Sequence, residues 1–410
     1  MSNKALFKEC GEKSPIFVIS LERSGSTLLR NILDAHPEIF APAQLNIGHL
    51  CHWTYWTSYY SIAQINTSLN EDKRKEAAIE ETRNTVNGLM YGFTSKKNKS
   101  VWCDKSTMNI KRLEILTKIF PDARFICLYR NCLDFVYSYI SISKLGFMEE
   151  VAPYVQKNPF NFVSAISDSW IDRTSAILDF ESSGTAKCYR VNYESLVSDT
   201  VEILKDLFSF LELEWDDGLV NRVFSKDGKG PIEGDLKFQF SSKISTESVG
   251  QGVNIPLTCI SKPQMEQINA LLKRLGYPLI GTAAHPERSN ALRSEGKPLS
   301  DEKDHVREIF RTYFPDLLKK RMKNFPSLNC TCKMLVSGEG GGVWTFDLTK
   351  PGGEVREEDI DTVCTIGLSS DVLKNMLAGN IKPLDAYQKG LVGAFGDIRM
   401  AINFGRLLFG

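Results

Sequence analysis

The stretch Pro15–Phe40, PIFVISLERSGSTLLRNILDAHPEIF, decides the fold of the first part of the chain. Its apolar run Pro15–Ser20 predicts a short buried strand, and Leu28–Ala35 predicts a helix that ends before Pro37. The tight turn LERSGST lies between them. Strand, turn and helix in this order form an anion site, because the first N–H groups of a helix lack internal partners and the helix dipole adds positive charge there.

The turn carries further groups suited to an anion. Gly25 lets the backbone approach a ligand closely, and Arg23 supplies a planar fork that can hold two oxygens. Ser24, Ser26 and Thr27 add hydroxyl donors. The signature GxxxxGK[ST] is absent, which disfavours ATP or GTP binding and a P-loop kinase. A plain polar turn that caps a helix remains an alternative.

Composition sets the limits of the function. The chain has 410 residues, no formal net charge and ordinary apolar and charged fractions of 42% and 24%. We therefore expect no nucleic-acid partner. Because the first 14 residues lack a signal-peptide core and no run approaches 18 apolar residues, we expect a cytoplasmic protein without a transmembrane segment. No CxxC or HExxH pattern occurs, so no metal is expected.

Strand and helix patterns alternate through the first 280 residues. Further strands are predicted at Val101–Cys103, Arg124–Tyr129 and Lys187–Val191. Helices are predicted at 73–91, Asn109–Phe120, Leu133–Ile140 and Leu196–Leu211. This alternation predicts an α/β fold, a P-loop-like parallel sheet flanked by helices.

A second polar cluster follows the strand Arg124–Tyr129. Arg130 ends this strand, and Ser138 follows eight residues later in the predicted helix. Ser138 would lie about two turns into that helix and face back toward Arg130. Two strand ends prepared for anions in one sheet predict a ligand that carries phosphates at two places.

These two motifs carry a resemblance to a known family. RSGST at Arg23–Thr27 and RxxxDxxxS at Arg130–Ser138 resemble the PAPS-dependent sulfotransferases, closest to the bacterial branch related to tyrosylprotein sulfotransferases, over residues 13–281. The resemblance implies that the first motif binds the 5′-phosphosulfate of PAPS (3′-phosphoadenosine 5′-phosphosulfate) and the second its 3′-phosphate. Tyr193 lies in a segment similar to the family's YExL. Ser242 lies in FSSKISTESVGQGVNIP, similar to the loop that closes over the nucleotide.

The resemblance also implies catalytic roles. Arg23 would stabilise charge on the transferring sulfonate or its bridging oxygen, as sulfuryl transfer requires fixed positive charge. Lys105 aligns with a lysine that stabilises the leaving group in relatives, and Ser242 with a serine that touches the bridging oxygen. For Lys105, a surface ion pair with Asp104 is the alternative.

The general base departs from the family pattern. Relatives usually carry a glutamate shortly after HPEI, where this chain has Gln44, and an amide cannot accept a proton at neutral pH. His49 and His52 are candidates, since imidazole titrates in the working range and their spacing suits one helix face. Asp104 is a third candidate. Packing or surface roles for both histidines remain open.

The segment His52–Tyr60, HWTYWTSYY, is dense in aromatic side chains. Two interpretations are open. The segment lines an apolar acceptor pocket, or it belongs to the core.

The last part of the chain has a different pattern. Residues 282–304 are rich in charge, Ser and Pro and predict a linker between domains 1–281 and 305–410. The second domain is predicted as a small α+β fold. Its helices are expected at His305–Asn324, Asp371–Leu377, Leu384–Lys389 and Ile398–Leu408, and its strands at Cys332–Ser337, Val343–Thr349, Val363–Leu368 and Val392–Phe395, with a hairpin turn in SGEGGGV.

This domain also resembles a known family. WTFDL, TIGLS and the closing GD are similar to the SCP2 sterol-carrier domain, over residues 305–410. The resemblance implies a lipid or acyl chain in an apolar tunnel. A domain kept for stability or for homodimer formation is the alternative.

Together the motifs predict an enzyme that moves a sulfonate group from PAPS to a hydroxyl, with an amine as second choice, of a lipophilic small molecule. The SCP2-like domain would bind or present that molecule. Gln44 motivates a rival hypothesis, a lipid-binding protein whose sulfotransferase-like domain no longer catalyses.

Overall fold

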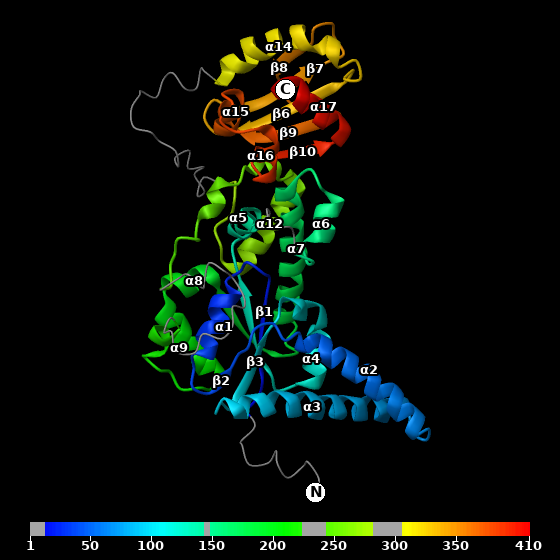
Figure 1. Cartoon of the computed structure of the whole chain (residues 1–410), viewed down its shortest axis with the longest axis vertical. Helices are drawn as coiled ribbons and strands as arrows, with labels where there is room; N and C mark the ends of the chain where they lie inside the picture. Colours follow the sequence, from blue (N-terminus) through cyan, green and yellow to red (C-terminus); the bar gives the residue numbers. More distant parts are fainter. Residues whose placement is uncertain (1–12, 143–147, 224–242, 282–305) are drawn as a thin grey trace. The chain divides into compact units, whose positions relative to one another are not determined.

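The computed structural model describes residues 13–142, 148–223, 243–281 and 306–410 (Figure 1). It divides into two compact units. The first comprises residues 1–130 and 172–247, and the second residues 131–171 and 248–410. The predicted linker 282–304 lies outside the described residues, so the predicted domain limits stay a prediction.

A five-stranded parallel sheet organises the first unit. Its strand order is β2-β3-β1-β4-β5. The strands are β1 (Ile16–Ser20), β2 (Ile39–Phe40), β3 (Val101–Lys105), β4 (Arg124–Tyr129) and β5 (Lys187–Asn192). Every residue of β1, β3 and β4 is buried, as a parallel sheet covered on both faces requires. The predicted fold class and its four predicted strands are confirmed; the two-residue β2 is too short to leave a pattern in the sequence.

The core of this sheet is built on β1. Phe17 is fully buried, and its ring lies 5.5 Å from that of Trp102, 5.8 Å from that of Phe120 and 5.3 Å from that of Phe125. These aromatic contacts join β1 to both neighbouring strands and to Phe120, which directly follows the helix α4 (Leu113–Ile119). The apolar run that predicted the first strand therefore forms the centre of the unit.

Helices cover the sheet of the first unit. They are α1 (Ser26–Asp34), α2 (Ile47–Ile65), α3 (Glu71–Lys96), α4 (Leu113–Ile119), α8 (Tyr193–Ser198), α9 (Thr200–Leu211) and α10 (Leu219–Arg222), with the second half of α7 (Phe162–Ser182). A 3₁₀ turn, η2 (Thr107–Arg112), precedes α4. Helices α2 and α3 run antiparallel as a hairpin (Figure 1). Helix α2 was not predicted as a whole, because its 19 residues include no charged side chain that would mark an exposed face.

The second unit begins with short elements that follow the first sheet along the chain. They are α5 (Cys132–Ile142), α6 (Ala152–Lys157), the first half of α7, the 3₁₀ turns η4 (Gln251–Asn254) and η5 (Leu257–Cys259), and α12 (Lys262–Leu275).

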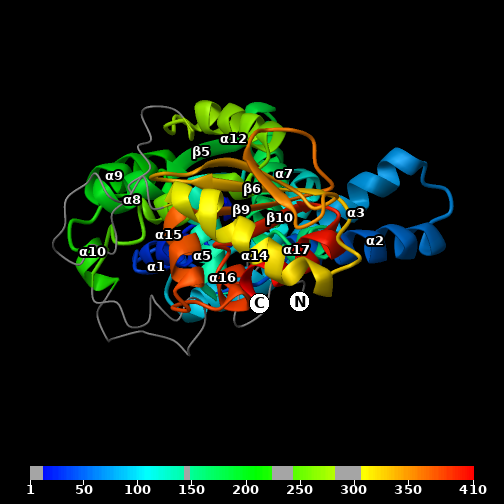
Figure 2. The ribbon, with the colours of Figure 1, turned by 90° about the horizontal axis from the view of Figure 1, so that it is seen from above.

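The predicted small α+β domain is the rest of the second unit. Its sheet has the order β10-β9-β6-β7-β8, parallel between β6 and β9 and antiparallel elsewhere. Helices α14 and α17 lie together on this sheet (Figure 2). The strands are β6 (Thr331–Ser337), β7 (Gly342–Asp347), β8 (Glu354–Glu357), β9 (Cys364–Ser369) and β10 (Val392–Gly396), and the helices are η6 (Ile309–Tyr313, a π turn), α14 (Phe314–Arg321), η7 (Met322–Asn324), α15 (Ser370–Leu377), α16 (Pro383–Gln388) and α17 (Ile398–Phe409).

Aromatic side chains fill the space under these helices. Phe310 stacks on Trp344 with ring centres 4.4 Å apart, and Phe346 contacts Phe314 and Phe404. All five side chains are buried.

Across the described ranges of both units, no helix has the length and apolarity that crossing a bilayer demands.

The packing around Phe17 yields a test of the first unit. Phe17→Ala should lower the free energy of unfolding by about 3–5 kcal/mol, because it opens a cavity between three rings. Trp53→Ala, at a side chain 65% exposed, should change it by less than about 0.5 kcal/mol. Urea unfolding of both variants measures the difference. A loss below about 1 kcal/mol for Phe17→Ala would contradict this packing.

Candidate active site

The carboxyl ends of the parallel strands meet at one edge of the first sheet. The RSGST loop follows β1, Lys105 ends β3, Arg130 follows β4, and Tyr193 follows β5. From β1 the chain first builds β2 and β3 on one side and then β4 and β5 on the other. Such a reversal of strand order is where ligands bind in open α/β sheets.

Two residues of the loop have left-handed backbone conformations, which glycine adopts readily and arginine does not. Arg23 and Gly25 have φ values of 60° and 84°, in the left-handed region. A Cβ on Gly25 would lie 2.2 Å from Cδ2 of Tyr193, so glycine is required there. Within the described residues no side-chain oxygen caps the first turn of α1. The interpretation of RSGST as a polar capping turn therefore has no support in the geometry.

Arg130 ties three strand ends together. Its Nη1 donates a hydrogen bond of 2.6 Å to the carbonyl oxygen of Arg23, and its guanidinium lies 4.7 Å over the ring of Tyr193. Both side chains are buried, with exposed fractions of 6% and 8%. This contact places a guanidinium cation beneath the anion loop.

A buried ion pair at the start of the loop was not predicted from the sequence. Nη1 of Arg173, in α7, donates to Oε1 of Glu22 at 2.6 Å, and Nη2 bonds to the second carboxylate oxygen. The two side chains are 11% and 7% exposed. This two-point contact fixes the loop before its strained residues. A charge two residues after a buried strand was the signal for Glu22, but 151 residues separate the partners.

Asp104 is committed to a structural role. Its Oδ2 accepts from the backbone N–H of Ile47 at 3.0 Å and from Nδ2 of Asn109 at 2.8 Å. Its Oδ1 accepts from Oγ of Ser106 at 2.6 Å. The carboxylate thus caps the start of α2 and anchors it to β3. Burial raises the pKa of Asp104. With both oxygens engaged, this carboxylate is a poor choice for the general base.

Lys105 follows Asp104 in the chain, but among the described residues its charged group lacks the hydrogen-bond partners that Asp104 has. Its side chain is 7% exposed, and no hydrogen bond or ion pair of its Nζ occurs within the described part of the chain. The interpretation of Lys105 as a surface ion-pair partner of Asp104 is therefore wrong. Burial, followed by the charge of Arg30, lowers the pKa of Lys105. The site holds a desolvated cation at the end of β3.

The base candidates lie at the start of α2. Gln44 is exposed before the helix, whereas His49 and His52 are half-buried on α2. Among the described residues Nδ1 of His49 is buried and has no hydrogen-bond partner. Burial, with smaller effects from Arg112 and His49, lowers the pKa of His52. The cap by Asp104 brings this end of α2 to the carboxyl end of β3.

Comparison with known proteins finds two family models that match this chain. Residues 15–217 match the model of the Sulfotransferase family, and residues 315–409 match that of the SCP-2 sterol transfer family. The chain joins a sulfotransferase domain to an SCP2 domain.

Relatives of the sulfotransferase domain include protein-tyrosine sulfotransferases. Protein-tyrosine sulfotransferase 1 of Danio rerio is 25% identical over 276 residues, which cover 64% of this chain and 72% of that protein. Protein-tyrosine sulfotransferase A of Caenorhabditis elegans is 24% identical over 275 residues, 64% of this chain and 67% of that protein. Family and relatives support sulfonyl transfer as the chemistry of the chain.

Among solved structures, a sulfotransferase domain from the Synechococcus PCC 7002 olefin synthase is similar to the chain. It covers 66% of this chain and 98% of its own, with a TM-score of 0.46 and 20% identity. Sterol carrier protein 2 from Yarrowia lipolytica covers 26% of this chain and 85% of its own, with a TM-score of 0.20 and 17% identity.

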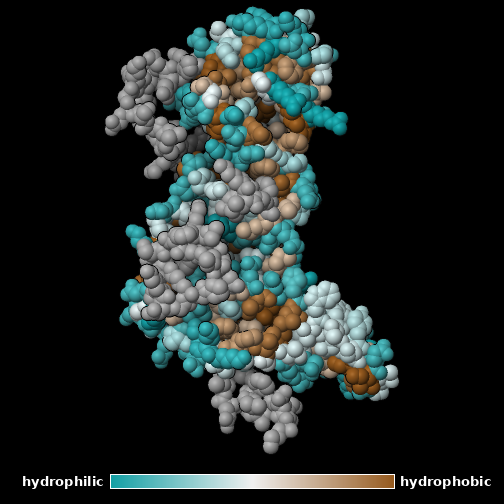
Figure 3. All heavy atoms as spheres, in the orientation of Figure 1, coloured by the Kyte–Doolittle hydropathy of each residue, from teal (hydrophilic) through white to brown (hydrophobic). Residues whose placement is uncertain are grey.

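The remaining predicted residues of the sulfotransferase domain fall in different places. Ser138 lies on α5 in the second unit, and Ser242 lies outside the described residues. The aromatic segment His52–Tyr60 is not core, because Trp53 and Tyr60 are 65% and 62% exposed. Figure 3 shows the pale and brown side chains on the surface of the α2–α3 hairpin. The sequence offered two interpretations of this segment, an acceptor pocket or the core. The structure excludes the core, because these aromatic rings lie at the surface.

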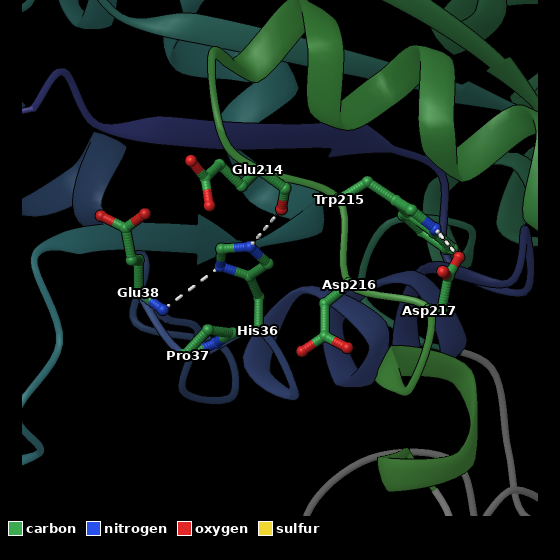
Figure 4. Close-up of a pocket in the computed structure, with 7 residues that line it drawn as sticks. All are labelled: His36, Pro37, Glu38, Glu214, Trp215, Asp216 and Asp217. Atoms are coloured by element: carbon green, nitrogen blue, oxygen red, sulfur yellow. Dashed lines mark hydrogen bonds between the residues drawn. The ribbon is translucent and has the colours of Figure 1, made fainter.

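A cavity of about 510 Å³ opens elsewhere in the sulfotransferase domain (Figure 4). His36 at its wall accepts from the N–H of Glu38 at 3.2 Å through Nδ1, so Nε2 carries the proton and donates to the carbonyl oxygen of Glu214 at 3.0 Å. Burial lowers the pKa of His36, which keeps this bridge neutral. Because these residues follow α1 and α9, the cavity lies at the amino-end edge of the sheet, away from the anion loop.

The buried cation yields a test in the absence of ligand. Lys105→Met should raise the free energy of unfolding by about 1 kcal/mol or more at pH 7, because a buried uncompensated charge is removed. The unfolded chain holds its lysine proton up to pH ~10.4, whereas the folded chain releases it earlier. Stability of the native sequence should therefore rise with pH in the window just below that value, and the variant should lose this rise.

Urea unfolding between pH 7 and pH 10 measures this effect. Lys75→Met, at an exposed lysine paired with Glu71, is the matched control and should change stability by less than about 0.5 kcal/mol. A destabilised Lys105→Met protein would show that Lys105 is a structural residue.

Proposed function

We propose that the sulfotransferase domain transfers a sulfonate group from PAPS to the hydroxyl of a lipophilic small molecule. The observation that carries this proposal is the convergence of the strained Gly25 loop, the buried Arg130 and the desolvated Lys105 at one edge of the sheet. Two fixed cations and a helix N-terminus suit a nucleotide with anionic groups at two places. The family generally uses PAPS, which agrees with this choice.

The reaction needs positioning and positive charge. The acceptor oxygen attacks the sulfur in line, the bond between sulfur and the bridging phosphate oxygen breaks, and adenosine 3′,5′-bisphosphate (PAP) leaves with that electron pair. Arg23 holds the sulfonate oxygens, and Lys105 stabilises charge on the bridging oxygen. Arg130 and Ser138 hold the 3′-phosphate. The low polarity around Lys105 strengthens its attraction for this developing charge.

His49 is our choice for the general base in place of Gln44. Its shielded Nδ1 has no partner within the described residues, and the cap by Asp104 holds its helix at the end of β3, where Lys105 lies. His52 is one helical turn further along α2 and is the second candidate. The proton of the acceptor hydroxyl passes to the imidazole as the new S–O bond forms.

The lipophilic acceptor follows from the fused SCP2 domain. Its family matches sterol transfer proteins, so a lipid or acyl compound is the class of molecule it would bind or present. A sulfotransferase domain that only binds nucleotide is the second candidate function, and the exposed Gln44 at the place of the expected base is the observation behind it.

The charge clamp yields the first activity test. Arg23→Ala should lower the rate of PAP formation from PAPS and a lipid alcohol at least about 10²-fold, and Arg23→Lys should recover part of it, because a point charge replaces the fork. Arg222→Ala, at an arginine paired with Asp216 away from the loop, is the control and should keep the native rate. Undiminished turnover by Arg23→Ala would reject the mechanism.

Native protein that binds PAP but turns over no member of a panel of lipid alcohols and amines would instead favour the second candidate. The panel should start from lipids that co-purify with the protein and are identified by mass spectrometry.

The base assignment has its own test. His49→Asn should lower kcat about 10²-fold and remove the acid limb of the pH profile of kcat/KM, whereas His52→Asn should preserve that limb. Gln44→Glu, introduced into the His49→Asn protein, should restore part of the rate by returning a carboxylate to the place where relatives carry one. Equal pH profiles for native protein and His49→Asn would remove His49 from the mechanism.

A further inference from the structure

The sheet of the SCP2 domain contacts η5 within the second unit. Gly367 of β9 and Gly393 of β10 are register partners. A Cβ on Gly367 would lie 2.5 Å from the carbonyl oxygen of Thr258, and a Cβ on Gly393 would lie 2.7 Å from Sγ of Cys259. Two adjacent strands therefore omit side chains where η5 lies against them.

Backbone hydrogen bonds strengthen this contact. The N–H of Ala394 in β10 donates to the carbonyl oxygen of Phe160 at 3.2 Å. Nδ2 of Asn161 donates to the carbonyl oxygen of Cys259 at 2.8 Å, and Sγ of Cys259 donates to that of Gly367 at 3.6 Å. Asn161 and Cys259 are fully buried. A buried contact with backbone bonds is typical of a built-in interface, whereas a domain that only carries cargo on a tether needs no such contact.

The turn η4, which precedes η5 in the chain, is held by helix α5. Asp134, in the first turn of α5, accepts from the N–H of Gly250 at 2.7 Å and from that of Gly252 at 2.6 Å. A Cβ on Gly252 would lie 2.4 Å from Cβ of Leu133, so η4 is seated directly on this helix. Helix α5 starts two residues after Arg130 and carries Ser138.

We propose that the SCP2 domain is a structural support of helix α5 and, through it, of Ser138. Its glycine pair, Gly367 and Gly393, holds η5 and η4 against α5, and α5 carries Ser138, a proposed group for the 3′-phosphate. Gly367, Gly393 and Asp134 are then positioning residues for nucleotide binding. The inference rests on the proposed function, because it requires PAPS as the ligand.

The test measures PAP binding to the full chain by titration calorimetry. Gly393→Ala should weaken PAP binding at least about fivefold, the lower range of typical coupling between sites. It should raise KM for PAPS more than it changes kcat, because no group at the reacting atoms is altered. Gly405→Ala is the matched control in the same domain. The nearest atom to its Cβ would be 4.0 Å away, so PAP affinity should stay within about twofold of native.

A rescue separates this role from general damage. Cys259→Ala removes the atom nearest to the new Cβ and should restore much of the PAP affinity in Gly393→Ala. It should not restore Gly367→Ala, whose Cβ meets a backbone oxygen. If Gly393→Ala fails to fold, Asp134→Asn, which removes one of the two acceptors for η4, should show the same loss of PAP affinity.

Three outcomes are distinguishable. Native protein that binds no PAP would reject the proposed function itself. Native protein that binds PAP, together with folded Gly393→Ala or Asp134→Asn protein that binds it within about twofold of native, would overturn the inference. A loss of affinity in these variants, with rescue by Cys259→Ala and none in Gly405→Ala, would support it.

Discussion

The contact between Gly25 and the ring of Tyr193 is the constraint on which the site depends. It requires a residue without a side chain in the loop after β1, and it brings the start of α8 against that loop. Arg130 then closes the group, since its guanidinium covers the same ring and bonds to the loop backbone. Three strand ends far apart in the sequence are thus fixed to one another by the protein's own side chains, which is the preorganisation that electrostatic catalysis requires.

Among the described residues, the buried charged side chains of the sulfotransferase domain are of two kinds, those with hydrogen-bond partners and those without. Glu22 with Arg173 and the carboxylate of Asp104 are satisfied by partners and hold backbone in place. Lys105 is buried without such partners in the described residues, and we expect its charge to lower the stability of the fold. Sites of this kind trade stability for function, because the missing partner is supplied by the substrate. The difference between Asp104 and Lys105, neighbours in one strand, shows how burial alone does not define a role.

The sequence was informative where a pattern is local. Alternating apolar runs predicted β1, β4 and β5, and the glycines of the SGEGGGV segment predicted the β6–β7 hairpin. Arg23, Arg130 and Tyr193 were found through motifs, and the structure brings them together. Long-range partners left no signal: 151 residues separate Arg173 from Glu22. The glycine pair of β9 and β10 is explained by its contact with η5, which lies more than 100 residues earlier in the chain. Helix α2 was not predicted as a whole, because it has no charged side chains and charged side chains normally mark the exposed face of a helix.

Arg23 occupies a left-handed conformation that favours glycine or asparagine, at a cost of about 1 kcal/mol for a side chain of its kind. The hydrogen bond from Arg130 to its carbonyl oxygen helps to hold this geometry. Any lineage or laboratory selection that rewards thermal robustness alone would therefore drift toward glycine at this position and lose the guanidinium. If orthologous chains keep an arginine at this position, its conservation would indicate that selection acts on the chemical role of the guanidinium.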